Sequence, residues 1–431
     1  MVPADLRVHH ATLDNGLRVV RVEQPQLHGI CVSLHLNVGS RFESTATNGR
    51  SHMLEHMLFR GTPTYPNAHA QARAVERLGG TLYAATHTDR GHMSVTLPPE
   101  NFDEGVALFG EVVTHPLFAD IEVERGIIRE EILEDLDEDG NSVDPDNLAR
   151  ALIYPSHPLG MSITGSLASV DAIDEAGLRA HHLEFYTGDN AVLCFAGPID
   201  VERCADLAAR HFSALPRGNV PTTSPPPAQQ QPRFQYTDNQ GSQTDLRLAF
   251  RAPGLNDPDE PATELIVRLL DDGMSTRLYA KICDEKGLCY DVSAEYEPYA
   301  DDGVLDLAAA VRHERAPLVM RELAEIVASL SREGPTEEEL RICKNRHRWE
   351  LQALLDHTEG LADYHGVAQL QQHGDPLQAR QQRIEAVSRD QIVHTARRIF
   401  APKNLSAVAV GMLRRNQRKE LEQIVTSFRA A

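Results

Sequence analysis

The order of apolar and polar positions in the first half of the chain predicts strands followed by amphipathic helices. Segments 17–24 and 29–39 are rich in Val, Leu and Ile, and segments 81–88 and 91–98 have the pattern of a β-hairpin. A further strand is predicted at 191–199. Apolar residues spaced for one helix face predict helices at 48–59, 67–78, 101–114, 121–138 and 201–215.

The second half of the chain repeats this order of elements. Strands are predicted at 244–254, 304–312 and 405–411, and helices at 262–272 and 317–334. The pattern therefore indicates two α+β halves, and their similar order suggests an internal duplication.

A segment dense in Pro, Ser, Thr and Gln separates the two halves at residues 216–232. Segments of this composition bury little apolar surface and tend to stay extended. A chain of 431 residues is also too long for one compact core. We therefore predict an N-terminal domain at 1–215 and a C-terminal domain at 233–431, joined by this linker.

The composition is that of an ordinary globular protein, but the net charge of −21 restricts its partners. An acidic surface repels phosphate backbones and anionic lipids, so we expect neither a nucleic-acid nor a membrane partner. Cationic peptides would be attracted to such a surface, and an acidic cavity would concentrate them.

The cysteines and the first residues bear on the cellular compartment. The six cysteines are scattered and form no C-x-x-C pair, which is typical of free thiols in a reducing compartment. The opening residues, MVPADLRVHH, lack the basic and apolar regions of a signal peptide, and no run of 18 apolar residues occurs. These features predict a cytoplasmic protein.

The segment NGRSHMLEHMLFRGTP carries the clearest chemical signal. We expect Asn48 or Ser51 to cap a helix here. On that helix His52, Glu55 and His56 fall within a sector of about 100°. Two imidazoles one turn apart can take two corners of a tetrahedral zinc site, and Glu55 lies where a general base belongs.

A catalytic zinc site commonly takes three protein ligands, so a third ligand is required. The predicted helix at 123–139 offers several carboxylates. Glu131 follows two isoleucines on a partly apolar face, and Glu124 lies two turns earlier on the same side. A carboxylate on such a face needs a partner, which a metal or a bound histidine would supply. The pattern alone does not choose Glu131 over Glu130 or Glu134.

Taken together, GRSHMLEHMLFRGT and ERGIIREEI resemble the motifs of the M16 peptidases, the inverzincin family of pitrilysin and the mitochondrial processing peptidases. The family pattern is H-x-x-E-H followed, after a fixed gap, by a ligand glutamate. Here 74 residues lie between His56 and Glu131, which matches that gap. The resemblance implies one Zn²⁺ per chain, held by His52, His56 and Glu131, with Glu124 as a supporting residue.

The resemblance extends over nearly the whole chain and adds candidate substrate residues. DGMSTRLYAKICDEKGLCYDV resembles the family's arginine–tyrosine segment, in which Arg277 and Tyr290 match residues that reach the substrate near the zinc. ERLGGTLYAATHTDR resembles the family's edge-strand region, so Tyr83 and Ala84 are expected to bind substrate. Tyr83 replaces the usual asparagine, a departure that affects how the substrate is positioned.

The resemblance also implies a fold and an assembly. Family members of this length contain two homologous α/β domains, each a mainly antiparallel sheet with helices packed on one face. They pair into clamshells that enclose the substrate. We therefore expect a homodimer, or a heterodimer with an M16 paralogue.

These features predict a zinc-dependent endopeptidase that cleaves unfolded or small peptides in a closed chamber. Glu55 would take a proton from the attacking water and return it to the leaving amine. Arg277 and Tyr290 would stabilise the developing oxyanion or anchor the peptide. The extended peptide would add to the edge strand within 80–86 by β-augmentation.

Two alternatives stay open. The chain could be a non-catalytic or weakly active partner subunit of a heterodimeric processing protease, although such members typically lose the H-x-x-E-H motif that is intact here. It could also be a non-haem iron enzyme, since two histidines and one carboxylate describe that site too, but Glu55 would then have no task. The other histidines, such as His87 and His92, match no family role, and most of them are expected at the surface.

Overall fold

The computed structural model describes residues 6–372 and 376–429, and the chain forms two compact units. Unit one comprises Met1–Glu134, Met161–Thr223 and Glu350–Gln378. Unit two comprises Asp135–Gly160, Ser224–Trp349 and Ala379–Ala431. Residues 1–5, which are half of the segment assessed for a signal peptide, lie outside the described ranges.

Unit one is built on a six-stranded, mainly antiparallel sheet with the strand order β1-β2-β6-β3-β5-β4. Only β2 and β6 pair in parallel. The strands are β1 (Arg7–Thr12), β2 (Arg18–Glu23), β3 (Ile30–Leu36), β4 (Thr81–Thr86), β5 (Gly91–Leu97) and β6 (Ala191–Gly197). The strands and the hairpin predicted in this half are confirmed.

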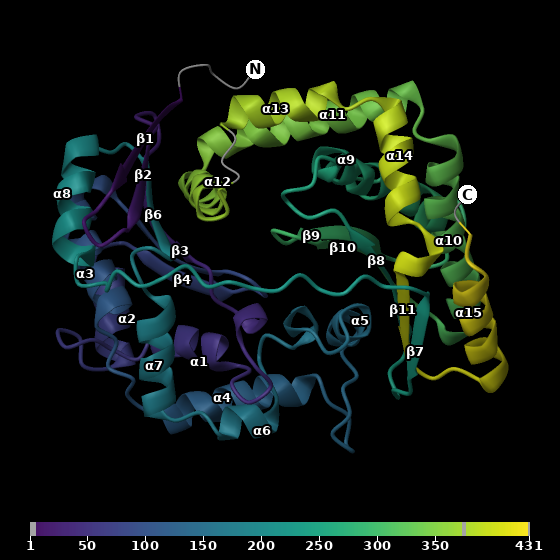
Figure 1. Cartoon of the computed structure of the whole chain (residues 1–431), viewed down its shortest axis with the longest axis horizontal. Helices are drawn as coiled ribbons and strands as arrows, with labels where there is room; N and C mark the ends of the chain where they lie inside the picture. The colour runs from purple at the N-terminus through teal and green to yellow at the C-terminus, as the bar shows by residue number, and fades with distance from the viewer. Residues whose placement is uncertain (1–5, 373–375, 430–431) are drawn as a thin grey trace. The chain divides into compact units, whose positions relative to one another are not determined.

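Helices cover both faces of this sheet, and not one face as the family resemblance implied (Figure 1). On one face, Phe195 of β6 packs edge-on against Phe102 of α3, and α8 lies along β2. On the other face, Leu361 and Ala362 of α12 pack against Cys31 of β3 and other strand residues. The helices of this unit are α1 (Arg50–Met57), α2 (Ala68–Arg77), α3 (Phe102–Thr114), α4 (Ile121–Glu134), α6 (Leu167–Asp171), α7 (Glu175–Phe185), α8 (Val201–Phe212) and α12 (Thr358–Leu370).

Unit two repeats the topology of unit one. Its five-stranded sheet has the order β7-β11-β8-β10-β9, and only β7 and β11 pair in parallel. Without β1, both sheets place their strands in the order first, fifth, second, fourth, third, which supports the predicted duplication. The strands are β7 (Arg233–Thr237), β8 (Thr244–Ala252), β9 (Val292–Pro298), β10 (Gly303–Val311) and β11 (Leu405–Val410).

The sheet of unit two is also covered on both faces. Helices α9, α10 and α14 pack on one face, around Leu248 and Leu307, and α5 packs on the other, where Ala149 meets Val408. Among the described residues, no helix is long and apolar enough to span a membrane. The remaining helices are α5 (Pro145–Ile153), α9 (Glu260–Leu270), α10 (Ala316–Glu333), α11 (Glu337–Ala353), α13 (Leu377–Ala386), α14 (Arg389–Ile399) and α15 (Arg415–Ser427).

The compact units differ from the predicted domains in two segments. Residues 135–160, which include α5, come from the first half but belong to unit two. Residues 350–378, which include α12, come from the second half but belong to unit one. The physical reason is burial, because β3, β6 and β11 are buried on both faces, and the helices that follow the strands in sequence cover only one face of each sheet. Residues 213–232, which include the predicted linker, contain no helix or strand.

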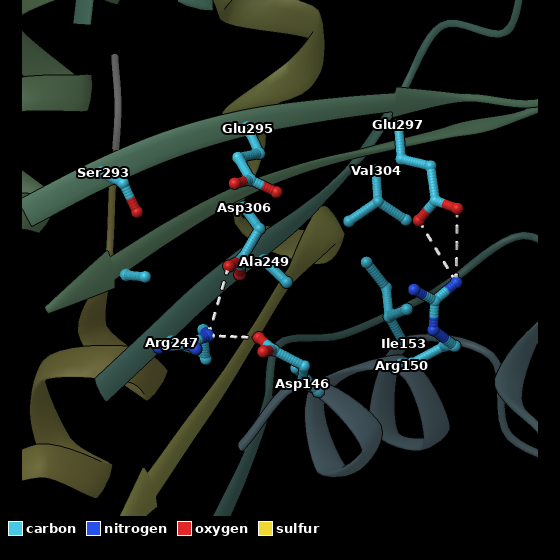
Figure 2. Close-up of a pocket in the computed structure, with 12 residues that line it drawn as sticks. Asp146, Arg150, Ile153, Arg247, Ala249, Ser293, Glu295, Glu297, Val304 and Asp306 are labelled. Carbon is cyan, nitrogen blue, oxygen red and sulfur yellow. Dashed lines mark hydrogen bonds and ion pairs between the residues drawn. The ribbon is translucent and has the colours of Figure 1, made fainter. Parts of the chain in front are cut away.

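A charged cavity of about 300 Å³ lies between α5 and strands β8, β9 and β10 (Figure 2). Arg247 Nε lies 2.6 Å from Asp146 Oδ1 and 3.5 Å from Asp306 Oδ2. Arg150 Nη1 lies 3.2 Å from Glu297 Oε2. The other oxygen of Asp306, Oδ1, is buried and has no hydrogen-bond partner in the described part of the chain. Burial raises the pKa of Asp306 to about 7, although Arg247 opposes the shift.

This carboxyl group predicts a pH-dependent stability. The folded chain keeps a proton on Asp306 that the unfolded chain releases above pH ~4, so stability decreases as the pH rises toward 7. Asp306→Asn removes this titration. We expect the unfolding free energy of the variant, relative to wild type, to increase by about 2 kcal/mol between pH 5 and pH 8 in urea titrations. The exposed control Asp284→Asn should show no such change, and an equal difference at both pH values for Asp306→Asn would contradict the assignment.

Candidate metal centre

Helix α1 carries the H-x-x-E-H motif and is anchored at its N-terminus by a buried carboxylate. Glu43 Oε1 accepts hydrogen bonds from the backbone N–H and the hydroxyl of Ser51, both at 2.7 Å, and Oε2 accepts from the N–H of Gly49 at 2.8 Å. The prediction that Asn48 or Ser51 caps this helix is wrong, because Gly49 is the N-cap and Glu43 supplies the acceptors. A carboxylate at this position also complements the helix dipole.

Helices α1 and α4 bring His52, His56 and Glu131 together. His52 Nε2 lies 3.6 Å from Glu131 Oε2, and His56 Nε2 lies 3.8 Å from Glu131 Oε1. One nitrogen or oxygen atom of each residue lies within 4.8 Å of those of the other two. Ligand atoms around a tetrahedral zinc ion are roughly 3.3 Å apart, so small side-chain movements would complete this geometry.

The protonation of His52 suits a metal. Burial and the neighbouring His56 lower the pKa of His52 to about 4, so its imidazole is neutral at physiological pH and can donate an electron pair. Glu131 is partly exposed, with 40% of its side chain accessible, and offers a path from solvent. The donor set of two imidazoles and one carboxylate is one that zinc accepts.

Glu124 supports the metal group from behind. It is buried, its Oε2 lies 2.9 Å from His56 Nδ1, and it also pairs with Arg60. Burial opposes its charge, but His56 and Arg60 outweigh this effect and lower the pKa of Glu124. A carboxylate on the outer nitrogen of a ligand histidine fixes the tautomer in which the other nitrogen can bind metal. Arg60, which lies just beyond the end of α1, was not among the residues predicted for the site.

Glu55 lies beside the metal group without belonging to it. The hydroxyl of Thr86, the last residue of β4, donates a hydrogen bond of 2.5 Å to Glu55 Oε2. Burial raises the pKa of Glu55 and Glu131 adds to the effect, while Thr86 and His56 act in the opposite direction. Thr86 was not predicted either, because a threonine in a strand gives no signal of such a contact.

The predicted substrate residues occupy two places. Tyr83 and Ala84 lie on β4, an edge strand of unit one, and 56% of Tyr83 is exposed. Arg277 and Tyr290 belong to unit two. Arg277 donates hydrogen bonds to both carboxylate oxygens of Glu339, at 2.7 and 3.0 Å, just before a π-helical turn at Tyr279–Asp284. Tyr290 precedes β9 and is 95% exposed, so it does not pack within a strand.

Comparison with known proteins places the chain in a family. The family model described as insulinase (peptidase family M16) matches residues 18–166, and the model described as peptidase M16 inactive domain matches residues 172–346. The chain belongs to the M16 peptidase family. An uncharacterized zinc protease of Mycobacterium tuberculosis is 31% identical to this M16 chain over 94% of each sequence. Another, from Bacillus subtilis, is 27% identical over 83% of this chain and 87% of its own length.

Solved structures share the M16 fold. A protease from Helicobacter pylori matches 94% of this chain and all of its own with a TM-score of 0.87 at 22% identity. A structure described as the peptidase M16 inactive domain from Pseudomonas fluorescens matches 94% of this chain and 98% of its own with a TM-score of 0.86 at 21% identity. At such identities the likeness shows the fold alone.

The role of Glu124 can be tested through zinc affinity. Glu124→Gln should weaken zinc binding by about 10- to 100-fold, because a neutral amide no longer stabilises the ligand tautomer of His56 as a carboxylate does. Competition with a chromogenic chelator measures this change. Glu130→Gln, at an exposed position of the same helix, is the matched control. Equal zinc affinity for both variants would show that Glu124 has no supporting role.

Proposed function

We propose that this M16 chain is a zinc-dependent endopeptidase that hydrolyses unfolded or small peptides. The observation that carries this proposal is the convergence of His52, His56 and Glu131, with Glu55 next to the three but outside their ligand set. The relatives named zinc proteases support it. Zinc bound there would lower the pKa of a water molecule to about 7 and polarise the scissile carbonyl.

Glu55 supplies the proton transfers in this proposal. Its carboxylate accepts a proton as the water oxygen attacks the carbonyl carbon, and it returns that proton to the amine nitrogen as the C–N bond breaks. The hydrogen bond from Thr86 holds one carboxylate oxygen in place. Glu124, through His56, keeps the ligand histidine oriented during both steps.

The edge strand β4 would hold the substrate. Its free edge offers backbone groups to an extended peptide, which adds as a further strand next to Tyr83 and Ala84. A folded protein rarely presents such a segment, so unfolded or short peptides are the expected substrates. The family resemblance implies an asparagine at the position of Tyr83, and this departure favours the alternative of a weakly active partner subunit.

Arg277 and Tyr290 would complete the substrate site in a clamshell of two chains. The pairing of Arg277 with Glu339 holds its guanidinium in one orientation, and Tyr290 is free to meet a ligand. A homodimer would carry the full set of residues in each chain. A heterodimer with an M16 paralogue is the other arrangement.

The decisive experiment replaces Glu55 by glutamine. Glu55→Gln should keep zinc and lower kcat/KM by about 10²- to 10⁴-fold, because the amide cannot accept a proton. Digestion of a peptide library, followed by mass spectrometry, measures cleavage, and elemental analysis measures the metal. The exposed variant Glu130→Gln should cleave like wild type.

Three other outcomes would redirect the proposal. If zinc-loaded Glu55→Gln cleaved peptides as fast as wild type, the mechanism would be wrong. If zinc-replete wild type cleaved none of the varied peptides, the chain would be a partner subunit. If iron were the metal that purified with the protein and supported activity, the non-haem iron alternative would stand.

Tyr290→Phe tests the contribution of unit two. If the hydroxyl stabilises the oxyanion, kcat should decrease by about 10²-fold, whereas a role in anchoring the peptide would mainly raise KM. The side chain is 95% exposed, so the unfolding midpoint should not change. Steady-state kinetics and urea unfolding of the same preparation separate these effects. Unchanged kinetic constants would remove Tyr290 from the proposed site.

A further inference from the structure

A second group of metal-ligand side chains lies on the opposite face of the unit-one sheet from α3. It consists of His35 on β3, His92 on β5 and Asp363 on α12. One nitrogen or oxygen atom of each residue lies within 4.8 Å of those of the other two. None of the three belongs to α1 or α4, so this group is separate from the H-x-x-E-H centre.

His35 is fully buried and has one nitrogen without a hydrogen bond. Its Nε2 lies 2.9 Å from the hydroxyl oxygen of Ser33, whereas Nδ1 has no hydrogen-bond partner among residues 6–372 and 376–429. Nδ1 lies 4.0 Å from Asp363 Oδ1, which is beyond hydrogen-bond distance. If Nε2 carries the proton and donates it to Ser33, the lone pair of Nδ1 is available to a metal.

A glycine on α12, Gly366, leaves room for the ring of His35. A Cβ atom on Gly366 would lie 2.2 Å from Cδ2 and Nε2 of His35, so only glycine fits at this position of the helix. Burial and the neighbouring His92 lower the pKa of His35 well below its ordinary value, although the Ala362 carbonyl acts in the opposite direction. The imidazole is therefore neutral, which is the form that binds metals.

His92 and Asp363 complete the set. His92 is an exception to the expectation that most of the other histidines lie at the surface, because its half-buried ring stacks on His35 with centroids 4.7 Å apart. Asp363 is half exposed and brings a negative charge. Arg90 opposes a cation here, since it lowers the pKa of both histidines, whereas Asp363 raises the pKa of His92 and favours a cation.

A cavity of about 650 Å³ gives access to this group. His92 and Asp363 line it, together with Tyr83 of the edge strand and Glu359 one turn before Asp363. Glu359 is engaged elsewhere, because the hydroxyls of Thr96 and Thr358 donate hydrogen bonds to it at 2.9 and 3.0 Å. His35 is buried behind His92 and Asp363, so water from the cavity could take the remaining coordination position of a three-ligand site.

We propose that His35, His92 and Asp363 bind a second divalent transition-metal ion of the kind that imidazole prefers, such as Zn²⁺ or Co²⁺. The ion would join β3 and β5, from the first half of the chain, to α12 from the second half. Its role is to hold α12 on the sheet. The chain would then carry two metal ions instead of the one expected from its H-x-x-E-H motif.

Metal stoichiometry tests this proposal without reference to peptide cleavage. Zn²⁺ titration, with bound metal measured after dialysis, should find two ions in wild type and one in Asp363→Asn. The double variant His52→Ala/His56→Ala should retain one ion, and adding Asp363→Asn to it should weaken that binding by at least about tenfold. Co²⁺ added to the double variant should give visible absorption bands that disappear with Asp363→Asn.

Glu359→Gln is the matched control, because it removes a carboxylate from the same helix and cavity that is not in the ligand set. It should leave both ions bound. Asp363 is half exposed and asparagine has its shape, so Asp363→Asn should fold, which circular dichroism verifies. One ion in wild type, no ion in His52→Ala/His56→Ala, or unchanged stoichiometry in Asp363→Asn would overturn the proposal.

Discussion

Helices cover both faces of each sheet, and the need to bury the central strands between them organises the rest of the chain. Every residue of β3 and β6 is buried, which requires helices above and below the strands. Helices that follow the strands in sequence cover one face, as α3 and α8 do in unit one. The other face takes a helix from the opposite half of the chain, α12 in unit one and α5 in unit two.

This packing holds the metal-ligand side chains on rigid elements. In unit one, α1 is held at its start by Glu43, and Glu55 is tied to the last residue of β4, so the motif helix and the edge strand are linked by direct hydrogen bonds. Glu124 fixes His56 from α4. Catalysis depends on side-chain positions to within a fraction of an ångström. The ligands therefore need these supporting contacts to hold them in place.

The period of apolar residues was sufficient to predict most strands and helices. The H-x-x-E-H spacing was sufficient to predict that His52 and His56 share one helix face. The choice of Glu131 required the resemblance to a family, because several carboxylates on α4 satisfy the same pattern. Glu43, Thr86 and Asp363 could not be predicted, since each makes its contact through tertiary packing. An apolar stripe shows that a helix must be buried, but not which sheet it will cover, and this is why the destinations of α5 and α12 differ from the predicted domains.

The exchange of α5 and α12 has a consequence for the origin of the fold. If a half-length ancestor was duplicated, as the shared strand order suggests, that ancestor had one sheet face with no helix of its own to cover it. Two copies that exchanged this helix in a domain-swapped dimer would each have covered the exposed sheet face of the other. Fusion of the two copies then made the helix exchange intramolecular. Its effective concentration became roughly millimolar and no longer depended on the concentration of the protein in the cell.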